Sequence, residues 1–188
     1  MKTLNFKSAV FFALTALSTM TLSAQSADAN SDANYDNGFR LGFGVTPGYV
    51  LREPYGFSLG GDVRLQYDFS KRYSVTLTSG YTHLFAKDVD VVGFEAHDLG
   101  FIPVKAGFKA FWWEDQFYAM GEAGAGFAVT SEINKTTAIL SPSIGWANDY
   151  LDISVRYDYF SDFPGISNNE FKDGNHQIAL RFAYGFRL

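Results

Sequence analysis

The sequence predicts an all-β protein, an eight-stranded antiparallel up-and-down transmembrane β-barrel. After Asn37, apolar residues alternate with polar or small residues in eight successive segments, the period of a β-strand with two different faces. The connections between these segments are alternately short and long. The composition, with 18% aromatic residues and 18 glycines, also fits short strands and turns. Because lipid cannot hydrogen-bond a free sheet edge, a sheet of this pattern in a membrane must close.

The N-terminal residues 1–24 predict a cleaved signal peptide. Lys2 and Lys7 precede an apolar run over 9–17, and this run is too short for a helix that spans a bilayer, which needs roughly 20 apolar residues. An N-terminal anchor helix is the alternative, and the polar residues that follow the run from Ser18 onward disfavour it.

Cleavage is expected after Ala24, with Ala29 as the second choice. Residues 25–36 are small, polar and acidic, so they predict a flexible leader that cannot bury apolar surface. Residues 37–188 then form the transmembrane β-barrel.

Six of the eight segments alternate cleanly between an apolar face and a polar or small face. They are Phe39–Val45, Leu59–Phe69, Tyr73–Thr82, Phe117–Phe127, Leu151–Tyr159 and Gln177–Leu188. The segments near 97–112 and 136–147 are less regular, and each contains a proline, Pro103 and Pro142. Since proline cannot donate a hydrogen bond to a neighbouring strand, we expect a bulge or a local break at both positions and at Pro47.

The connections separate the two ends of the barrel. Tight turns are expected at 70–72, 113–115 and 148–149, and longer polar loops at 52–57, 86–96, 129–135 and 161–175. All the long loops fall at one end, so the sequence predicts that they face the cell exterior, while the turns face the periplasm.

A soluble eight-stranded barrel of the lipocalin type would show the same alternation with its apolar face inside. Two features favour a membrane barrel. The polar face carries both signs of charge and many glycines, which fits a narrow, filled lumen. Aromatic residues also gather near the strand ends in two belts, as two membrane interfaces require. The belt at the turn end includes Trp112, Trp113, Trp146, Tyr150, Tyr184 and Phe186, and the belt at the loop end includes Tyr49, Tyr55, Phe57, Tyr81, Phe85, Phe127, Tyr159 and Phe160.

Strand parity places a set of charged residues in the lumen: Arg40, Asp62, Arg64, Asp68, Lys105, Lys109, Glu122, Asp152, Arg156, Asp158, Arg181 and Arg187. Buried charges must be paired, so we expect a connected network in which Lys105 lies opposite Glu122 across a hairpin. The network could be an ion path or a polar plug. The plug is favoured because side chains just fill the interior of an eight-stranded barrel.

The signal peptide, the eight alternating segments, the tight turns at one end and the final segment Gln177–Leu188 resemble the small eight-stranded outer-membrane barrels of Gram-negative bacteria, the OmpX and OmpA-barrel type. The chain departs from that pattern at Leu188, where such barrels usually have an aromatic residue; here Phe186 is the nearest one. The resemblance implies export through the Sec pathway to the outer membrane, with both termini in the periplasm. It also implies contact with outer-membrane lipid, including lipopolysaccharide, and a possible envelope protein partner through the external loops.

That family contains structural and adhesive barrels, narrow pores and lipid-modifying enzymes, so the fold alone does not assign a function. The leading hypothesis is a structural or interaction barrel with a filled lumen. The alternative is a narrow pore for ions or small solutes, and the third hypothesis is a lipid-modifying enzyme.

Motifs for catalysis or cofactor binding are not found in the sequence. His83, His97 and His176 are expected at the loop end, with Ser161, Ser167, Asp162 and Glu170 as neighbours, but no His-x-Ser spacing occurs. We therefore predict no catalytic residues, no cofactor and no metal site. The absence of cysteine excludes a disulfide scaffold, and a net charge of −5 disfavours nucleic acid as a partner.

Overall fold

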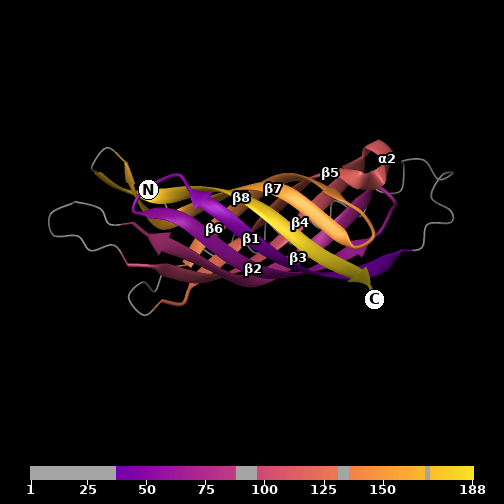
Figure 1. Cartoon of the computed structure of the whole chain (residues 1–188), viewed down its shortest axis with the longest axis horizontal. Coiled ribbons are helices and arrows are strands. Elements are labelled where there is room, and N and C mark those ends of the chain that lie inside the picture. The colour runs from indigo at the N-terminus through magenta and orange to yellow at the C-terminus, as the bar shows by residue number, and fades with distance from the viewer. Residues whose placement is uncertain (1–36, 88–96, 131–135, 168–169) are drawn as a thin grey trace, which may run out of the picture. The chain divides into compact units, whose positions relative to one another are not determined.

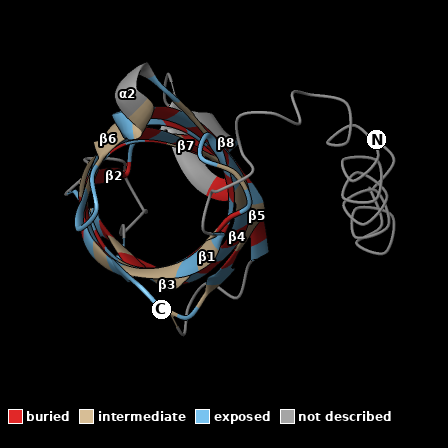
Figure 2. Cartoon of the chain, turned by 90° about the vertical axis from the view of Figure 1, so that its right-hand side faces the viewer, coloured by how far each residue is buried: buried red, intermediate tan, exposed pale blue. Residues whose placement is uncertain are grey.

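The computed structural model describes residues 37–87, 97–130, 136–167 and 170–188, and these form one closed antiparallel barrel in which the strands follow chain order. The strands are β1 Gly38–Val50, β2 Tyr55–Asp68, β3 Tyr73–Ala86, β4 Leu99–Trp112, β5 Phe117–Ala128, β6 Thr136–Ala147, β7 Leu151–Ser167 and β8 Glu170–Arg187, with the single turn of helix α2 Trp113–Gln116 between β4 and β5. Pairing of β1 with β8 closes the ring (Figure 2). The predicted fold class is confirmed.

The two faces of the sheet are distributed as in a membrane barrel. Outward-facing Phe43 and Val45 are 51% and 55% exposed, whereas inward-facing Arg64 is 3% exposed. The same alternation of exposed apolar and buried polar positions runs along most of the barrel. The lipocalin-type alternative, which needs the apolar face inside, is therefore wrong.

The three prolines expected to disturb a strand, Pro47, Pro103 and Pro142, each interrupt one ladder of backbone pairs. Paired residues are missing between Val45↔Phe182 and Gly48↔Ala179 at Pro47, between Ser79↔Val104 and Thr82↔Phe101 at Pro103, and between Leu140↔Tyr159 and Ser143↔Arg156 at Pro142. The register is the same on both sides of each gap, so these are local breaks and not bulges. Proline causes the break because it has no N–H to donate to the ladder.

The turns and the loops lie at opposite ends of the barrel (Figure 1). The start of β1, the end of β8 and α2 are at one end, which we call the turn end. The ends of β1, β3, β5 and β7, each followed by the start of the next strand, are at the other, the loop end. Leu188 N donates to Phe39 O at 2.9 Å, which holds the last residue beside the first strand.

Two connections differ from their expected form. β2 already begins at Tyr55, so the expected loop over 52–57 is shorter. The expected loop over 161–175 is mostly a hairpin, because β7 continues to Ser167 and β8 begins at Glu170. Pairing resumes at Pro164↔Asp173 after a register shift, and this hairpin projects past the barrel mouth (Figure 1). The other two loop predictions, 86–96 and 129–135, fall largely outside the described residues.

The predicted signal peptide and leader, residues 1–36, lie outside the described residues. Within the described part of the chain, no helix is long and apolar enough to cross a membrane.

Candidate functional site: the lumen

The middle of the lumen contains a cluster of buried ion pairs centred on Glu122 of β5. Its carboxylate accepts a hydrogen bond from Thr78 Oγ1 at 2.6 Å and lies 3.4 Å from Arg64 Nη2 and 3.3 Å from Lys105 Nζ. The Glu122 side chain is fully buried, as are nearly all atoms of both cations. Because a buried carboxylate is stable only with such partners, these contacts tie β2, β3, β4 and β5 together across the lumen.

Lys105 also links this cluster to the opposite wall. Its Nζ lies 3.7 Å from Asp158 Oδ1 and 3.2 Å from Ser141 Oγ. Asp158 in turn accepts hydrogen bonds from Ser141 Oγ at 2.5 Å and from Arg156 Nε at 3.0 Å. Strands β6 and β7 therefore join the same network.

A second cluster, nearer the turn end, converges on Asp152 of β7. Its carboxylate accepts hydrogen bonds from Lys109 Nζ at 2.8 Å and from Tyr118 Oη at 2.5 Å. Arg64 Nη1 and Arg181 Nη1 each lie 3.8 Å away. Lys109 Nζ lies 3.8 Å from the Tyr118 ring centroid, a favourable cation–π position.

Arg181 extends the network to β1 and β2. Its guanidinium donates to Asp62 at 2.6–3.0 Å, and a Cβ at Gly44 would lie 2.9 Å from that guanidinium. Glycine at this position therefore leaves room for the arginine. At the turn end, Arg40 donates to Asp68 at 3.0 Å.

The structure therefore places the predicted lumen charges inside the barrel, except Arg187. The predicted backbone pairing of Lys105 also differs from the observed one. Arg187 is exposed at the end of β8. Lys105 does contact Glu122, but it is paired with Gly124, and Glu122 is paired with Gly107. The prediction that Lys105 lies directly opposite Glu122 is wrong because the turn uses Trp113–Gln116, which moves the hairpin register.

The loop end of the lumen is apolar, which the sequence analysis missed. A cluster of fully buried residues fills it: Val50, Tyr55, Leu84, Leu99, Phe101, Ile139, Phe160 and Phe163. Tyr55 and Phe160 were predicted to belong to the aromatic belt at the membrane interface, and this is wrong because both face the lumen, where they are 2% exposed. Strand parity could have identified Phe160, which shares a face with Arg156 and Asp158. Tyr55 has the opposite parity to Asp62 and Arg64, and it reaches the lumen because the register shifts between Tyr55 and Ser58.

The other belt residues mostly face outward. At the turn end Trp112, Tyr150, Tyr184 and Phe186 are exposed, and the Tyr150 and Tyr184 rings stack with centroids 6.2 Å apart. Trp146 is half-buried and donates from Nε1 to Gln116 Oε1 at 2.9 Å. At the loop end Tyr49, Phe57, Tyr81, Phe85 and Phe127 are exposed. The side chain of Trp113 lies outside the described part of the chain.

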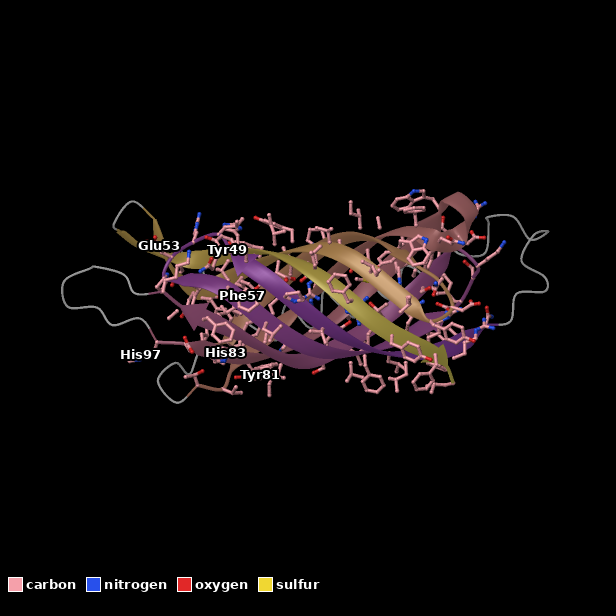
Figure 3. The ribbon with its side chains drawn as sticks, in the orientation of Figure 1. Tyr49, Glu53, Phe57, Tyr81, His83 and His97 are labelled. Atoms are coloured by element: carbon pink, nitrogen blue, oxygen red, sulfur yellow. The ribbon has the colours of Figure 1, made fainter. Side chains whose placement is uncertain are left out.

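His83 and His97 lie at the loop end, as expected (Figure 3). His176 is paired with Tyr159, near the same end of β7 and β8. His83 Nε2 is 3.1 Å from Asp98 Oδ2 and His83 Nδ1 is 3.2 Å from Tyr81 Oη. Bonds from the Ala86 N–H and from His83 hold the pKa of Asp98 below its ordinary value. His176 Nδ1 is 2.5 Å from Tyr157 Oη. The described hydrogen-bond partners of His83 and His176 are therefore tyrosine and aspartate side chains.

Of the serine and acid candidates, the structure describes the side chains of Ser161 and Asp162, and their described bonds are not to a histidine. Ser161 Oγ donates to Asp162 and accepts from Ala138 N. The side chains of Ser167 and Glu170 are outside the described set. Within the described residues, no group of three His, Cys, Asp or Glu side chains could hold a metal ion.

The barrel geometry can be compared with solved structures. It is similar to Ail, the attachment invasion locus protein of Yersinia pestis, solved with the heparin analogue sucrose octasulfate: the TM-score is 0.52 and the identity 18%, over 81% of this chain and 100% of Ail. It is also similar to the N-terminal β-barrel domain of Pseudomonas aeruginosa OprF, with a TM-score of 0.53 and 10% identity over 80% of this chain and 100% of that domain. No protein-family model and no curated protein sequence matches the chain.

These similarities and the closed eight-stranded topology define the class of structure. The chain has the fold of the small eight-stranded outer-membrane barrels.

Proposed function

We propose that this protein resides in the Gram-negative outer membrane as a structural or interaction barrel, and that its loop end is the contact surface. The observation that carries the proposal is the combination of an apolar exterior with a lumen filled by its own side chains. An exterior of Phe, Leu and Val is stable against acyl chains and costly against water. Lipid, including lipopolysaccharide, is then the partner of the wall, and other partners bind at the ends.

The β7–β8 hairpin supports the loop end as the contact surface. β7 pairs with β6 as far as Phe160, and β8 pairs with β1 as far as Gln177. Beyond these positions 164–167 of β7 pair with 170–173 of β8. A hairpin that continues past the barrel wall in this way is a common place for another polypeptide to bind by β-strand addition.

The comparison with Ail supports the same proposal, since Ail is named for attachment and was solved with a heparin analogue. At 18% identity this similarity concerns the fold, so the ligand of Ail is not carried over. The filled lumen disfavours the pore, and the histidine contacts described above give no support to the lipid-modifying enzyme.

Two measurements test the proposal. Separation of inner and outer membranes should place the protein in the outer fraction, and recovery in any other fraction contradicts the location. A photoreactive amino acid at Asp162, on the hairpin, should form adducts in native membranes, whereas the same amino acid at Asp149, in the β6–β7 turn, should not. Equal adducts at both positions, or none at Asp162, would contradict the loop end as the contact surface.

A further inference from the structure

The lumen is divided along its length into an apolar section and a polar section. The apolar section is the buried cluster at the loop end, which takes residues from β1, β2, β3, β4, β6 and β7. At its centre the Phe101 ring lies 5.4 Å from Phe160 and 5.1 Å from Phe163, and these two rings are 5.5 Å apart. Aromatic rings at such distances are in packing contact, so the centre of this section is occupied by apolar side chains.

The polar section and its boundary with the apolar cluster contain buried polar atoms that lack a hydrogen-bond partner. Among the described residues, four buried side-chain atoms have no hydrogen-bond partner: Ser58 Oγ, Arg64 Nη1, Ser143 Oγ and Gln177 Oε1. Arg64 and Ser143 lie in the polar section, whereas Ser58 and Gln177 are the backbone partners of Leu84 and Val50 and lie beside the apolar cluster. A buried polar atom without a partner destabilises the fold, and water commonly supplies the partner in protein interiors.

A small cavity lies at the boundary of the two sections. Phe101, Ile139 and Phe160 line it from the apolar cluster, and Lys105, Arg156, Asp158 and Gln177 line it from the polar section. Gln177 is 1% exposed and its Oε1 is one of the four unpartnered atoms. The cavity is therefore lined by a hydrogen-bond acceptor and charged groups on one side and by apolar side chains on the other.

Solvent reaches the polar section from the turn end. The side chain of Asp152 is 17% exposed and that of Arg40 is 26% exposed, whereas the cluster at the loop end is at most 2% exposed. We propose that the lumen is a blind polar well that binds water and small ions, opens only toward the turn end and is closed at the loop end by the apolar cluster. The permeability barrier is then the apolar section and not the ion-pair network, because an ion that crosses it must lose its hydration.

A matched pair of cysteine variants on β6 tests the division of the lumen. Ser143→Cys places a thiol in the polar section and Ile139→Cys places one in the apolar section; both positions are buried and face inward, and the natural chain has no cysteine. With the folded barrel in lipid vesicles, silver ion should react with the thiol at 143 at least about tenfold faster than with the thiol at 139. Equal rates, or no reaction at 143, would overturn the proposal.

Planar-bilayer recordings test which section is the barrier. The wild type should show no steady conductance, and Phe101→Ser with Phe160→Ser should open one, because the polar side chains wet the apolar section. Glu122→Gln, which weakens the ion-pair network and leaves the cluster intact, should stay silent. Heat-modified gel mobility confirms that each variant is folded. A folded double variant without conductance, or conductance in Glu122→Gln, would overturn the assignment of the barrier. If the double variant does not fold, the silver experiment decides alone.

Discussion

Lys105 Nζ lies 3.3 Å from Glu122 Oε2 although neither residue is the backbone partner of the other. The two are diagonal neighbours on the inner face of β4 and β5, displaced by two residues from direct opposition. Diagonal positions are about 7–8 Å apart on a sheet, and long side chains cover that separation. The pair therefore forms without the direct register that the sequence suggested.

The first prediction concerns this pair. Glu122→Ala should destabilise the folded barrel strongly, because it leaves Lys105 and Arg64 without their shared carboxylate. Loss of one partner of a buried pair costs roughly 3–5 kcal/mol, and less where water reaches the remaining charge. Urea titration in lipid vesicles measures the change.

Lys105→Ala combined with Glu122→Ala should be less harmful than the sum of the two single variants, since neither charge of the pair then remains buried alone. Thr78→Val is a control that removes one hydrogen bond to Glu122 without removing a charge. Strict additivity of the two alanine variants would contradict a coupled pair.

The second prediction concerns the outer wall. Leu65→Arg and Val155→Arg place a charge on exposed apolar positions between the two aromatic belts. Each should lower the free energy of unfolding in lipid vesicles by about 2–4 kcal/mol if the site is near the bilayer midplane. Thr76→Ala, on the inward face of β3, is the control and should have a smaller effect. Neutral results at both arginine sites would mean that this wall does not contact lipid.

The barrel and its two faces were predictable because strand parity follows directly from a period of two. Leu65, Val155 and Arg64 were assigned to the correct faces by parity alone. Register was harder to predict, since it depends on how many residues a turn uses. Because the turn uses the four residues of α2, the backbone partner of Lys105 is Gly124 and not the expected Glu122.

The apolar section of the lumen could not be predicted from the sequence for a different reason. Parity put Phe160 on the inner face, but an aromatic residue at a strand end fits a membrane interface equally well in a sequence. Only the convergence of Phe101, Phe160 and Phe163 from two strands in space separates the two interpretations. The β7–β8 hairpin was missed for a related reason, because polar residues and glycine over 161–175 suggest a loop, while pairing with the partner strand decides the structure.

The third prediction concerns orientation. A cysteine at position 168, between the ends of β7 and β8, should react with an impermeant maleimide on intact cells, because the loop end is expected to face outward. Asp149→Cys, in an exposed turn at the opposite end, should react only after the cells are lysed. The natural chain contains no cysteine, so wild-type cells give no signal from this protein. The reverse pattern of labelling would invert the orientation.

The fourth prediction concerns pH and the base of the β3–β4 loop. Asp98 Oδ1 accepts a hydrogen bond from Ala86 N at 2.8 Å, and its other oxygen lies near His83. These contacts lower the pKa of Asp98. A carboxyl group whose pKa is lowered by folding stabilises the structure above its unfolded pKa, about 3.9, and this contribution disappears as the pH falls through the folded value.

Hydrogen exchange measures this effect at single amides. After correction for intrinsic rates, the Ala86 amide should keep its protection from pH 7 to pH 5 and lose part of it below about pH 4. The neighbouring Lys87 amide donates to Pro54 O at 2.7 Å and involves no carboxylate, so its protection should change little and it serves as the internal control. In Asp98→Asn the acceptor remains but cannot titrate, and the Ala86 amide should lose its pH dependence. Parallel loss of protection at both amides would instead indicate unfolding of the whole barrel mouth.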